Sequence, residues 1–305
     1  VLKPVCELLM NLDPLLRGVT AAPLEINRLL RARFRLLGDS GIVGMALAGI
    51  DMAAWDALAR AEGRPLARAL GADVMAIPAY NSCGLGLIGP EAAPAEAEAL
   101  VAEGFSAIKV RLGYPDLATD LRVVRAVKAA IGPDVYLMSD YNQGLSVPEA
   151  ERRVLVLADE GLTWIEEPCL AHDYAGCARV RARSTCPIQI GENWWGPREM
   201  ADSLAAGASD LGMPDAMKIG GVSGWLQAAA LAEAAGLPLS THLFPEVSVH
   251  LMAATPTRHW LEYVDWASPV LAEPVRVRDG KVSVPDRVGT GIEWDEAAVA
   301  RCLAP

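Results

Sequence analysis

The sequence lacks the features that mark membrane, secreted and nucleic-acid-binding proteins. No uninterrupted apolar run approaches the roughly 18 residues that a membrane span needs. Six cysteines in 305 residues, none of them in a Cys-x-x-Cys pair, argue against a disulfide scaffold and suggest no zinc site. A net charge of −11 disfavours a nucleic-acid partner, because phosphate binding needs clustered Lys and Arg. With no signal-like segment at the start, we expect a cytoplasmic protein.

The sequence has an ordinary globular composition, and its hydrophobic pattern differs between two parts of the chain. Hydrophobic residues make up 52% of the chain and charged residues 21%, which suits one barrel of about 250 residues with a smaller attachment. Residues 5–75 have a helical pattern, since apolar and small residues recur at spacings of three and four. After residue 76, short apolar runs alternate with longer amphipathic runs.

Eight candidate strands alternate with candidate helices in this second part. This order predicts an α/β fold with a closed parallel barrel of the (β/α)8 TIM type, and an open doubly wound sheet is the alternative. The candidate strands are 77–80, 107–112, 135–140, 163–168, 188–193, 210–214, 237–242 and 260–264. The candidate helices include 94–103, 117–131, 147–160, 197–206 and 224–235.

Three regions are predicted along the chain. Residues 1–75 would form the helical part of a smaller α+β capping domain, 76–272 the catalytic barrel, and 273–305 a hairpin and helix that return to the cap. Alternating residues flank Asp279-Gly280, a pair that favours a hairpin turn. Because the chain starts at Val1 in what would be the middle of a domain, we expect a cap that is incomplete at its N-terminus.

Carboxylates stand near the carboxyl ends of three successive candidate strands. Asp140, Glu166 and Glu192 follow one another at intervals of 26 residues, one strand–helix unit each. In a barrel these ends form the catalytic face, and equal spacing brings the side chains to one height. Three carboxylates there would repel one another without a cation, and an all-oxygen set favours Mg²⁺. The alternative is that each carboxylate pairs with a nearby Lys or Arg.

Basic residues and a histidine are expected on the same face. Lys109 and Arg111 lie two apart on one strand, so both would point into the barrel, where a carboxylate substrate and an acidic metal site would compensate them. His242 ends the seventh candidate strand, and Asp215 could orient its imidazole so that it serves as a general base. Glu262, if buried, could stay protonated and donate a hydrogen bond to a developing oxyanion.

Several segments of the chain resemble the enolase superfamily, and within it the mandelate racemase/muconate lactonizing enzyme family. The resemblance covers nearly the whole chain, and the matching segments include SDYNQGL (139–145), WIEEP (164–168), IGENWWGP (190–197), MPDAMKIGGVSGW (213–225) and STHLFPE (240–246). It implies a barrel completed by a cap, with Mg²⁺ as the metal. It also implies that relatives form symmetric assemblies, so we expect a homo-oligomer.

The resemblance also implies a role for each site residue. Asp140, Glu166 and Glu192 would bind Mg²⁺, while His242, paired with Asp215, would take the proton from the α-carbon of the substrate. The remaining roles concern charge and substrate: Lys109 would neutralise the substrate carboxylate, Glu262 would donate to the enolate oxygen, Asn142 would contact the substrate hydroxyl or carboxylate, and Ser82 would line the site.

Arg111 departs from the family pattern, in which mandelate racemase has a lysine as a second base. A guanidinium, whose ordinary pKa lies above about 12, is a poor proton acceptor near neutrality unless its surroundings lower that value severely. A one-base reaction therefore becomes attractive, and β-elimination of water from an acid sugar is the obvious example.

The sequence thus predicts an enzyme that removes the α-proton of a 2-hydroxy carboxylate through an enediolate. Racemisation or epimerisation, as in mandelate racemase, is the first reading, and dehydration of an aldonate or aldarate by the His–Asp pair is the alternative. A third reading is a metal-binding barrel without catalysis. The expected partner is a small carboxylate, with no nucleic acid and no membrane.

Overall fold

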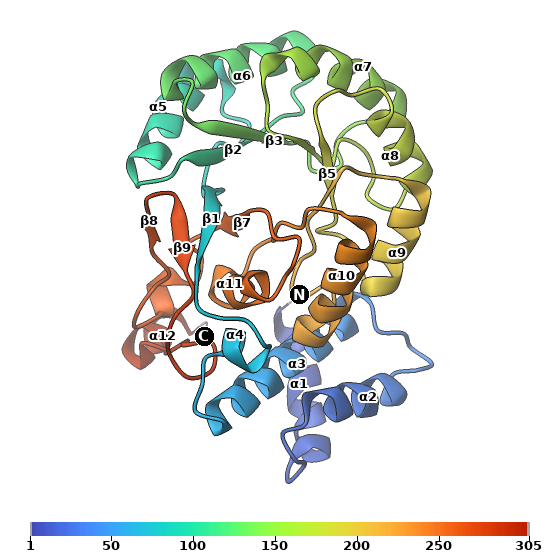
Figure 1. Ribbon diagram of the computed structural model, residues 1–305, viewed down its shortest axis with the longest axis vertical. Helices are drawn as coiled ribbons and strands as arrows, with labels where there is room; N and C mark the ends of the chain where they lie inside the picture. The colour runs from blue at the N-terminus through green and yellow to red at the C-terminus, as the bar shows by residue number, and fades with distance from the viewer. Residues whose placement is uncertain (1, 304–305) are drawn as a thin grey trace.

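Alternating strands and helices after residue 76 close into a barrel in the computed structural model, which describes residues 2–303 (Figure 1). Its parallel strands pair in sequence order from β1 to β6, and β1 also pairs with β7, which closes the ring. The seventh position is held by isolated bridges that join Leu239 to Gly212 and to Arg258. The strands are β1 (Ala76–Asn81), β2 (Ala107–Arg111), β3 (Tyr136–Asp140), β4 (Ile165–Glu166), β5 (Ile188–Ile190), β6 (Leu211–Gly212) and β7 (Leu261–Tyr263).

Helices follow the first seven strand positions and surround the barrel (Figure 1). Their apolar faces point inward; in α6, for example, Val123, Val124 and Val127 are buried, and Asp116 caps the helix by accepting from Thr119 N. The eighth position departs from the expected pattern, because β7 is followed by the short 3₁₀ helix η2 (Ser268–Val270). The helices are α5 (Gly89–Ala102), α6 (Leu117–Ile131), α7 (Val147–Leu157), α8 (Tyr174–Arg181), α9 (Pro197–Ala206), α10 (Gly221–Ala235) and α11 (Pro245–Ala253).

The barrel interior is apolar in its lower part and polar at its carboxyl end. Tyr80, Met138, Trp164 and Met213 belong to one buried cluster inside the ring. Residues two positions further along these strands point to the same side, because side chains alternate in a strand. Those positions hold Ser82, Asp140, Glu166 and Asp215. The period-two pattern thus places a layer of apolar side chains inside the barrel and a layer of polar side chains above it, at the carboxyl ends of the strands, which we call the barrel mouth.

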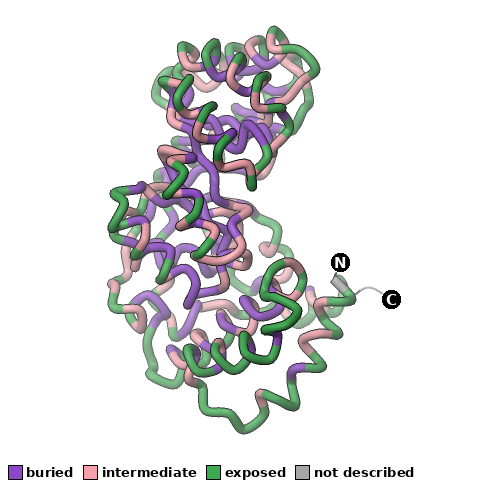
Figure 2. The backbone as a smooth tube through the Cα atoms, turned by 90° about the vertical axis from the view of Figure 1, so that its right-hand side faces the viewer, coloured by how far each residue is buried: buried purple, intermediate pink, exposed green. Residues whose placement is uncertain are grey.

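The first helices form a smaller body beside the barrel. They are α1 (Leu2–Leu16), α2 (Pro23–Arg33), α3 (Gly41–Ala61) and α4 (Leu66–Ala69). Figure 2 shows buried residues along the inner strands and inward helix faces, whereas most residues of α1 and α2 are exposed. In this part α3 contacts α1, α2 and α10, so it is the central helix.

By length and composition α3 is a candidate membrane span, with a mean hydropathy of 1.5. Its contacts explain its apolar character in another way, because Leu47 and Ala54 pack in a core with residues of α1 and α2. Asp51, in the middle of α3, is buried and accepts hydrogen bonds from the backbone and hydroxyl of Ser223 in α10. The core of a folded protein accounts for these features.

The C-terminal tail forms a hairpin, a connecting loop and a helix, as its sequence predicts. β8 (Val277–Arg278) and β9 (Lys281–Ser283) flank the Asp279-Gly280 turn, whose two residues both have positive φ as a tight hairpin requires. The hairpin pairs antiparallel with the beginning of β1, where Ala76 faces Ser283. The hairpin thus lies on the free lower edge of β1, and directly after it Val284 N donates to Met75 O.

The connecting loop of the tail does reach the N-terminal helices. Leu66 N donates to Gly289 O over 2.7 Å, and Asp56 accepts from the backbone and hydroxyl of Thr290. The last helix, α12 (Glu296–Cys302), lies beside η2. The tail thus connects the barrel to the helical body through its loop.

A glycine-rich segment after β1 has the spacing of a dinucleotide-binding motif. Gly84, Gly86 and Gly89 lie between β1 and α5 in a Gly-x-Gly-x-x-Gly pattern. The strand belongs to a closed barrel and not to an open doubly wound sheet, and the carboxylate of Glu96 lies 2.5 Å from where a Cβ of Gly84 would be. A carboxylate against this turn would repel a pyrophosphate, so the segment does not indicate a nucleotide site.

Candidate active site

Three carboxylates converge where β3, β4 and β5 end. Asp140 and Glu166 are the last residues of neighbouring strands and face each other in the parallel ladder. Glu192 follows β5, and one ligand oxygen from each residue lies within 4.8 Å of the other two. This all-oxygen set fits Mg²⁺, which takes carboxylates together with water or substrate oxygens. The structure therefore brings together the three residues predicted to hold the metal.

The turn that carries Glu192 depends on Gly191. This residue has a φ of +139°, and a Cβ there would lie 2.7 Å from the Trp194 ring and 2.8 Å from Met213 N. Any side chain would push the turn away from β6. Glycine lets the chain pass close to β6, so that Glu192 reaches the other carboxylates.

Lys109 is buried among these carboxylates as the central cation. Its Nζ lies 2.6 Å from Glu166 Oε1, 2.8 Å from Glu262 Oε1 and 3.4 Å from Asp140 Oδ2. Burial alone would lower the pKa of Lys109, but these neighbouring carboxylates raise it above its ordinary value. Burial raises the pKa of Glu166, which Lys109 only partly offsets. The cluster therefore holds more negative charge than Lys109 can balance. A divalent cation would reduce the repulsion between the carboxylates.

In this structure Glu262 makes the contacts of a hydrogen-bond acceptor, and its role as a donor to an oxyanion stays a prediction. Its carboxylate accepts from Lys109 Nζ through Oε1 and from Leu243 N through Oε2, the latter over 2.9 Å. Burial would raise the pKa of Glu262, yet Lys109 and His242 hold it well below its usual range. In this arrangement Glu262 is an ionised acceptor, because a cation lies closer to it than the sequence could indicate.

His242 and Asp215 form the expected pair. Nδ1 of His242 lies 2.7 Å from Asp215 Oδ2, and Nε2 lies 3.3 Å from Glu192 Oε2, so the second nitrogen faces the metal side of the site. Asp215 is itself fixed, since its Oδ1 accepts from Met217 N and Lys218 N. Burial lowers the pKa of His242, but Glu262, Asp215 and Glu192 raise it overall to about 9.

Arg111 lies at the mouth of the barrel and faces Asp140. Its Nε is 3.6 Å from Asp140 Oδ2, and its side chain is 26% exposed. Its buried Nη1 has no hydrogen-bond partner among residues 2–303. The guanidinium thus has a donor directed at neither protein nor solvent, as expected of a group that binds an anionic or hydroxylated substrate.

The two predicted substrate-binding residues lie at the same mouth. Asn142 donates to Asp140 through its backbone N over 2.7 Å and through Nδ2 over 2.9 Å, so in this structure it holds a carboxylate that is predicted to bind the metal. Ser82 is buried after β1, and its hydroxyl lacks a partner within the described part of the chain. A free buried hydroxyl suits the predicted position on the wall of a substrate site.

Sequence reasoning missed a second layer of residues around the carboxylates. Trp164 Nε1 and Gln189 Nε2 both approach Glu166 Oε2, at 3.0 and 3.3 Å. Asn193 donates to Glu167 and Glu192 and accepts from Lys218. The segments WIEEP and IGENWWGP contain Trp164, Glu167 and Asn193, but not Gln189 or Lys218, and only a position beside the predicted ligands could have indicated the first three.

Strained backbone marks the same face. Asn142, Gln143, Glu167, Leu243 and Phe244 all have positive φ without being glycine, and they follow β3, β4 and the seventh strand position. Such conformations cost about 1–3 kcal/mol each and concentrate where structure is held for function. The observation agrees with the placement of the site at the carboxyl ends of the strands.

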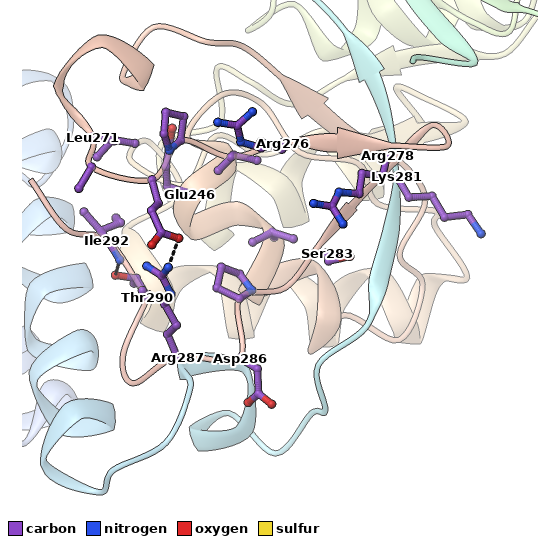
Figure 3. Close-up of a pocket in the computed structure, with 17 residues that line it drawn as sticks. Glu246, Leu271, Arg276, Arg278, Lys281, Ser283, Asp286, Arg287, Thr290 and Ile292 are labelled. Atoms are coloured by element: carbon purple, nitrogen blue, oxygen red, sulfur yellow. Dashed lines mark hydrogen bonds and ion pairs between the residues drawn. The ribbon is translucent and has the colours of Figure 1, made fainter. Parts of the chain in front are cut away.

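A cavity of about 630 Å³ lies away from this site, along the C-terminal tail (Figure 3). Arg276 and Arg278 line it from the hairpin, and Arg287 pairs there with Glu273. None of the converging carboxylates and neither member of the His–Asp pair lines it. The volume of this cavity therefore does not locate the candidate active site, whose residues lie at the barrel mouth.

A closed parallel barrel with three converging carboxylates, a buried lysine and an oriented histidine defines a metal-dependent barrel for carbon-acid chemistry. Comparison with known families agrees: residues 92–298 match the enolase C-terminal domain-like family. Residues 3–71 match the N-terminal domain of the mandelate racemase/muconate lactonizing enzymes. The chain belongs to the mandelate racemase/muconate lactonizing enzyme family of the enolase superfamily, as its sequence predicts.

Several individual proteins of this family are similar to the chain. The chain is 36% identical to the L-talarate/galactarate dehydratase of Salmonella typhimurium over 86% of its length, and it spans 66% of that protein. A solved enolase from alphaproteobacterium bal199 with bound Mg superposes with a TM-score of 0.97 at 46% identity, covering 99% of this chain and 85% of that one. A Bradyrhizobium enolase complexed with magnesium and mandelic acid gives 0.93 at 46% identity, with 98% and 82% covered.

Proposed function

We propose that this protein is a Mg²⁺-dependent enzyme that removes the α-proton of a 2-hydroxy carboxylate with one base and then eliminates water, as in the dehydration of an acid sugar. The observation that carries the proposal is the contrast between the two sides of the site. His242 is oriented by Asp215 with Nε2 directed toward the carboxylates, whereas Arg111 presents a guanidinium beside Asp140.

The residues of the chain divide the work of the first step. Asp140, Glu166 and Glu192 would hold Mg²⁺, which supplies positive charge to the substrate carboxylate as its α-proton leaves. Lys109, inside the barrel, would neutralise part of the negative charge that develops on the substrate carboxylate. The carboxylates that raise the pKa of His242 would be offset by bound Mg²⁺, so His242 would be neutral and would accept the proton at Nε2, while Asp215 stabilises the resulting imidazolium through Nδ1.

The second step decides the outcome. Electrons of the broken C–H bond occupy the enediolate, and their return expels the β-hydroxyl, which takes the proton from imidazolium His242 and leaves as water. The enol then tautomerises to a 2-oxo-3-deoxy acid. Arg111 would bind a hydroxyl or distal carboxylate through its free Nη1 donor. The similarity to a talarate/galactarate dehydratase supports this sequence of events.

Racemisation is the second candidate, and the mandelic acid in the Bradyrhizobium relative favours it. Moving the proton between the two faces of one carbon needs a donor on each side. Replacing Arg111 with lysine would supply a second base, so Arg111→Lys should create or raise racemisation of small 2-hydroxy acids. Fast racemisation by the unaltered protein that falls in this variant would show that the one-base proposal is wrong.

The direct experiment is a screen of aldonates, aldarates and aromatic 2-hydroxy acids with Mg²⁺. Formation of a 2-oxo acid from a sugar acid, measured as its semicarbazone, is the expected result. Exchange of the α-hydrogen in D₂O, followed by NMR, reports the first step alone. Inversion without 2-oxo acid would instead establish the racemase. If the protein showed no exchange and no turnover with any acid in the panel, that result would support a metal-binding barrel without catalysis.

Location and assembly are further proposals. All six cysteines are free thiols, and even the buried pair Cys169 and Cys177 is not bonded at an Sγ–Sγ distance of 3.5 Å. Free thiols fit the reducing cytoplasm. The exposed Trp266 and Trp294 suit contacts between copies in a homo-oligomer. Light scattering of the purified protein would test the assembly.

A further inference from the structure

Asn193, the residue after Glu192, makes hydrogen bonds inside the site through both the nitrogen and the oxygen of its side-chain amide. Its Nδ2 donates to both oxygens of Glu167, over 2.8 and 3.0 Å, and lies 3.3 Å from Glu192 Oε1. Its Oδ1 accepts from Lys218 Nζ over 2.7 Å. Glu167 is completely buried, so it fixes one side of the amide, and Lys218 fixes the other.

Lys218 reaches this amide from the loop that also carries Asp215. The backbone N of Lys218 donates to Asp215 Oδ1 over 2.9 Å, and the carbonyl of Lys218 accepts from Gly196 N. One residue thus contacts the partner of the base through its backbone and the neighbour of a metal-binding carboxylate through its side chain. The loops after β5 and β6 are joined at this point.

These contacts close into a ring. From His242 Nδ1 the path runs to Asp215 Oδ2, from Asp215 Oδ1 to Lys218 N, and from Lys218 Nζ to Asn193 Oδ1. It continues from Asn193 Nδ2 to Glu192 Oε1 and returns from Glu192 Oε2 to His242 Nε2 at 3.3 Å. Asp215, Lys218 and Asn193 therefore link the proposed base to Glu192, the proposed metal ligand.

We infer that Lys218, acting through Asn193, is a positioning residue that orients Glu192 for Mg²⁺ and couples that orientation to the His242–Asp215 pair. The inference rests on the proposed function, because it takes Glu192 as a metal ligand. Without the ammonium group, the Asn193 amide loses the partner that fixes its rotation, and Glu192 gains freedom. Supporting groups of this kind are worth about 10–100-fold in metal affinity.

The test measures metal binding directly. In Lys218→Met, Mn²⁺ affinity, measured by EPR of the free ion and by calorimetry with Mg²⁺, should weaken about 10–100-fold, while the thermal midpoint of the metal-free protein stays near that of the wild type. Lys218→Arg should restore most of the affinity, since a guanidinium can also donate to Asn193. Asn193→Ser, which removes the amide but keeps the lysine, should reproduce the loss.

Lys128 provides a matched control. It is also half-buried and also binds a single oxygen, the carbonyl of Gly161 at 2.8 Å, but this contact lies at the opposite end of the barrel. Lys128→Met should leave metal affinity unchanged. Equal affinity in Lys218→Met and the wild type, or an equal loss in the control, would overturn the inference and leave the proposed function standing. A wild type that binds neither ion would overturn both.

Discussion

Two polar clusters in this molecule are built on opposite principles. The catalytic-face cluster contains Lys109, Asp140, Glu166, Glu192, Asp215, His242 and Glu262. The helix–barrel junction contains Asn27, Asp51, Asp56, Ser223, His250 and Thr290. Both are largely buried. In the first, carboxylates crowd together with too few cations, whereas in the second each buried polar group faces a matched partner.

The junction shows how buried polarity is made stable. Asp51 accepts from Ser223 and Asn27, and His250 accepts from Ala67 N and donates to Thr290 O. Near the catalytic face, buried polar atoms of Ser82 and Arg111 have no partner within residues 2–303. Satisfied groups hold the helical body on the barrel, and unsatisfied groups leave binding capacity for a ligand. The comparison therefore separates residues of stability from residues of function.

The largest expected effect lies in the catalytic-face cluster. His242→Asn removes the proposed base, so turnover should fall by about 10²–10⁴-fold, and the thermal midpoint should barely change. His259→Asn is the matched control, because His259 precedes β7 at the other end of the barrel. Steady-state kinetics and thermal unfolding of both variants decide the matter. Activity retained in His242→Asn would remove this residue from the role of base.

At the junction the effect should be on stability. Asp51→Ala leaves the donors of Ser223 and Asn27 without an acceptor, and at about 1–3 kcal/mol for each unsatisfied group we expect a loss of about 2–4 kcal/mol in the free energy of unfolding. Burial raises the pKa of Asp51, so Asp51→Asn should cost less. Denaturant unfolding measures both. Asp13→Ala, on exposed α1, is the control and should change little.

Metal should stabilise one cluster only. Mg²⁺ at 100 times its dissociation constant should add about 2.7 kcal/mol to the free energy of unfolding, because it neutralises the crowded carboxylates. In Glu192→Gln the metal-free protein should melt at a higher temperature than the wild type, and the gain from Mg²⁺ should shrink. Calorimetric melts with Mg²⁺ or EDTA test this. An unchanged gain would place the metal elsewhere.

The smallest expected effect concerns pH at the junction. Burial lowers the pKa of His250 below 6.5, and its Nδ1 must stay unprotonated to accept from Ala67 N. The unfolded chain therefore takes up the proton first, so this contribution to stability is complete above pH 6.5 and declines below it. Unfolding between pH 5 and 8 should show a shallower decline in His250→Gln. An identical slope in both proteins would contradict the assignment.

The sequence predicted the barrel and the converging carboxylates because both depend on regular spacing. Strand–helix alternation and carboxylates at strand ends are periodic features, so Asp140, Glu166 and Glu192 could be placed before any distance was known. The places of Asp215 and His242 at successive strand ends also suggested their pairing, and the family resemblance supported it.

Other features depend on contacts that no spacing encodes. The charge of Glu262 is set by Lys109, which approaches it from another strand. The seventh strand position forms isolated bridges although its apolar pattern is regular. The hairpin pairs with β1 because that strand has a free lower edge, and nothing in residues 274–284 indicates the partner. Lys218 meets Asn193 only after two loops fold together.

The order of the site residues along the chain has a consequence for evolution. The three carboxylates come from one contiguous stretch, 140–192, and the proton-transfer pair comes from the next, 215–242. Substitutions within 215–242 would therefore alter the proposed proton transfer while the three carboxylates themselves are kept. Related proteins would then change their reaction by substitutions in one segment. Lys218 is the residue of that segment whose side chain contacts the carboxylate stretch, through Asn193, so such substitutions would need to keep this contact.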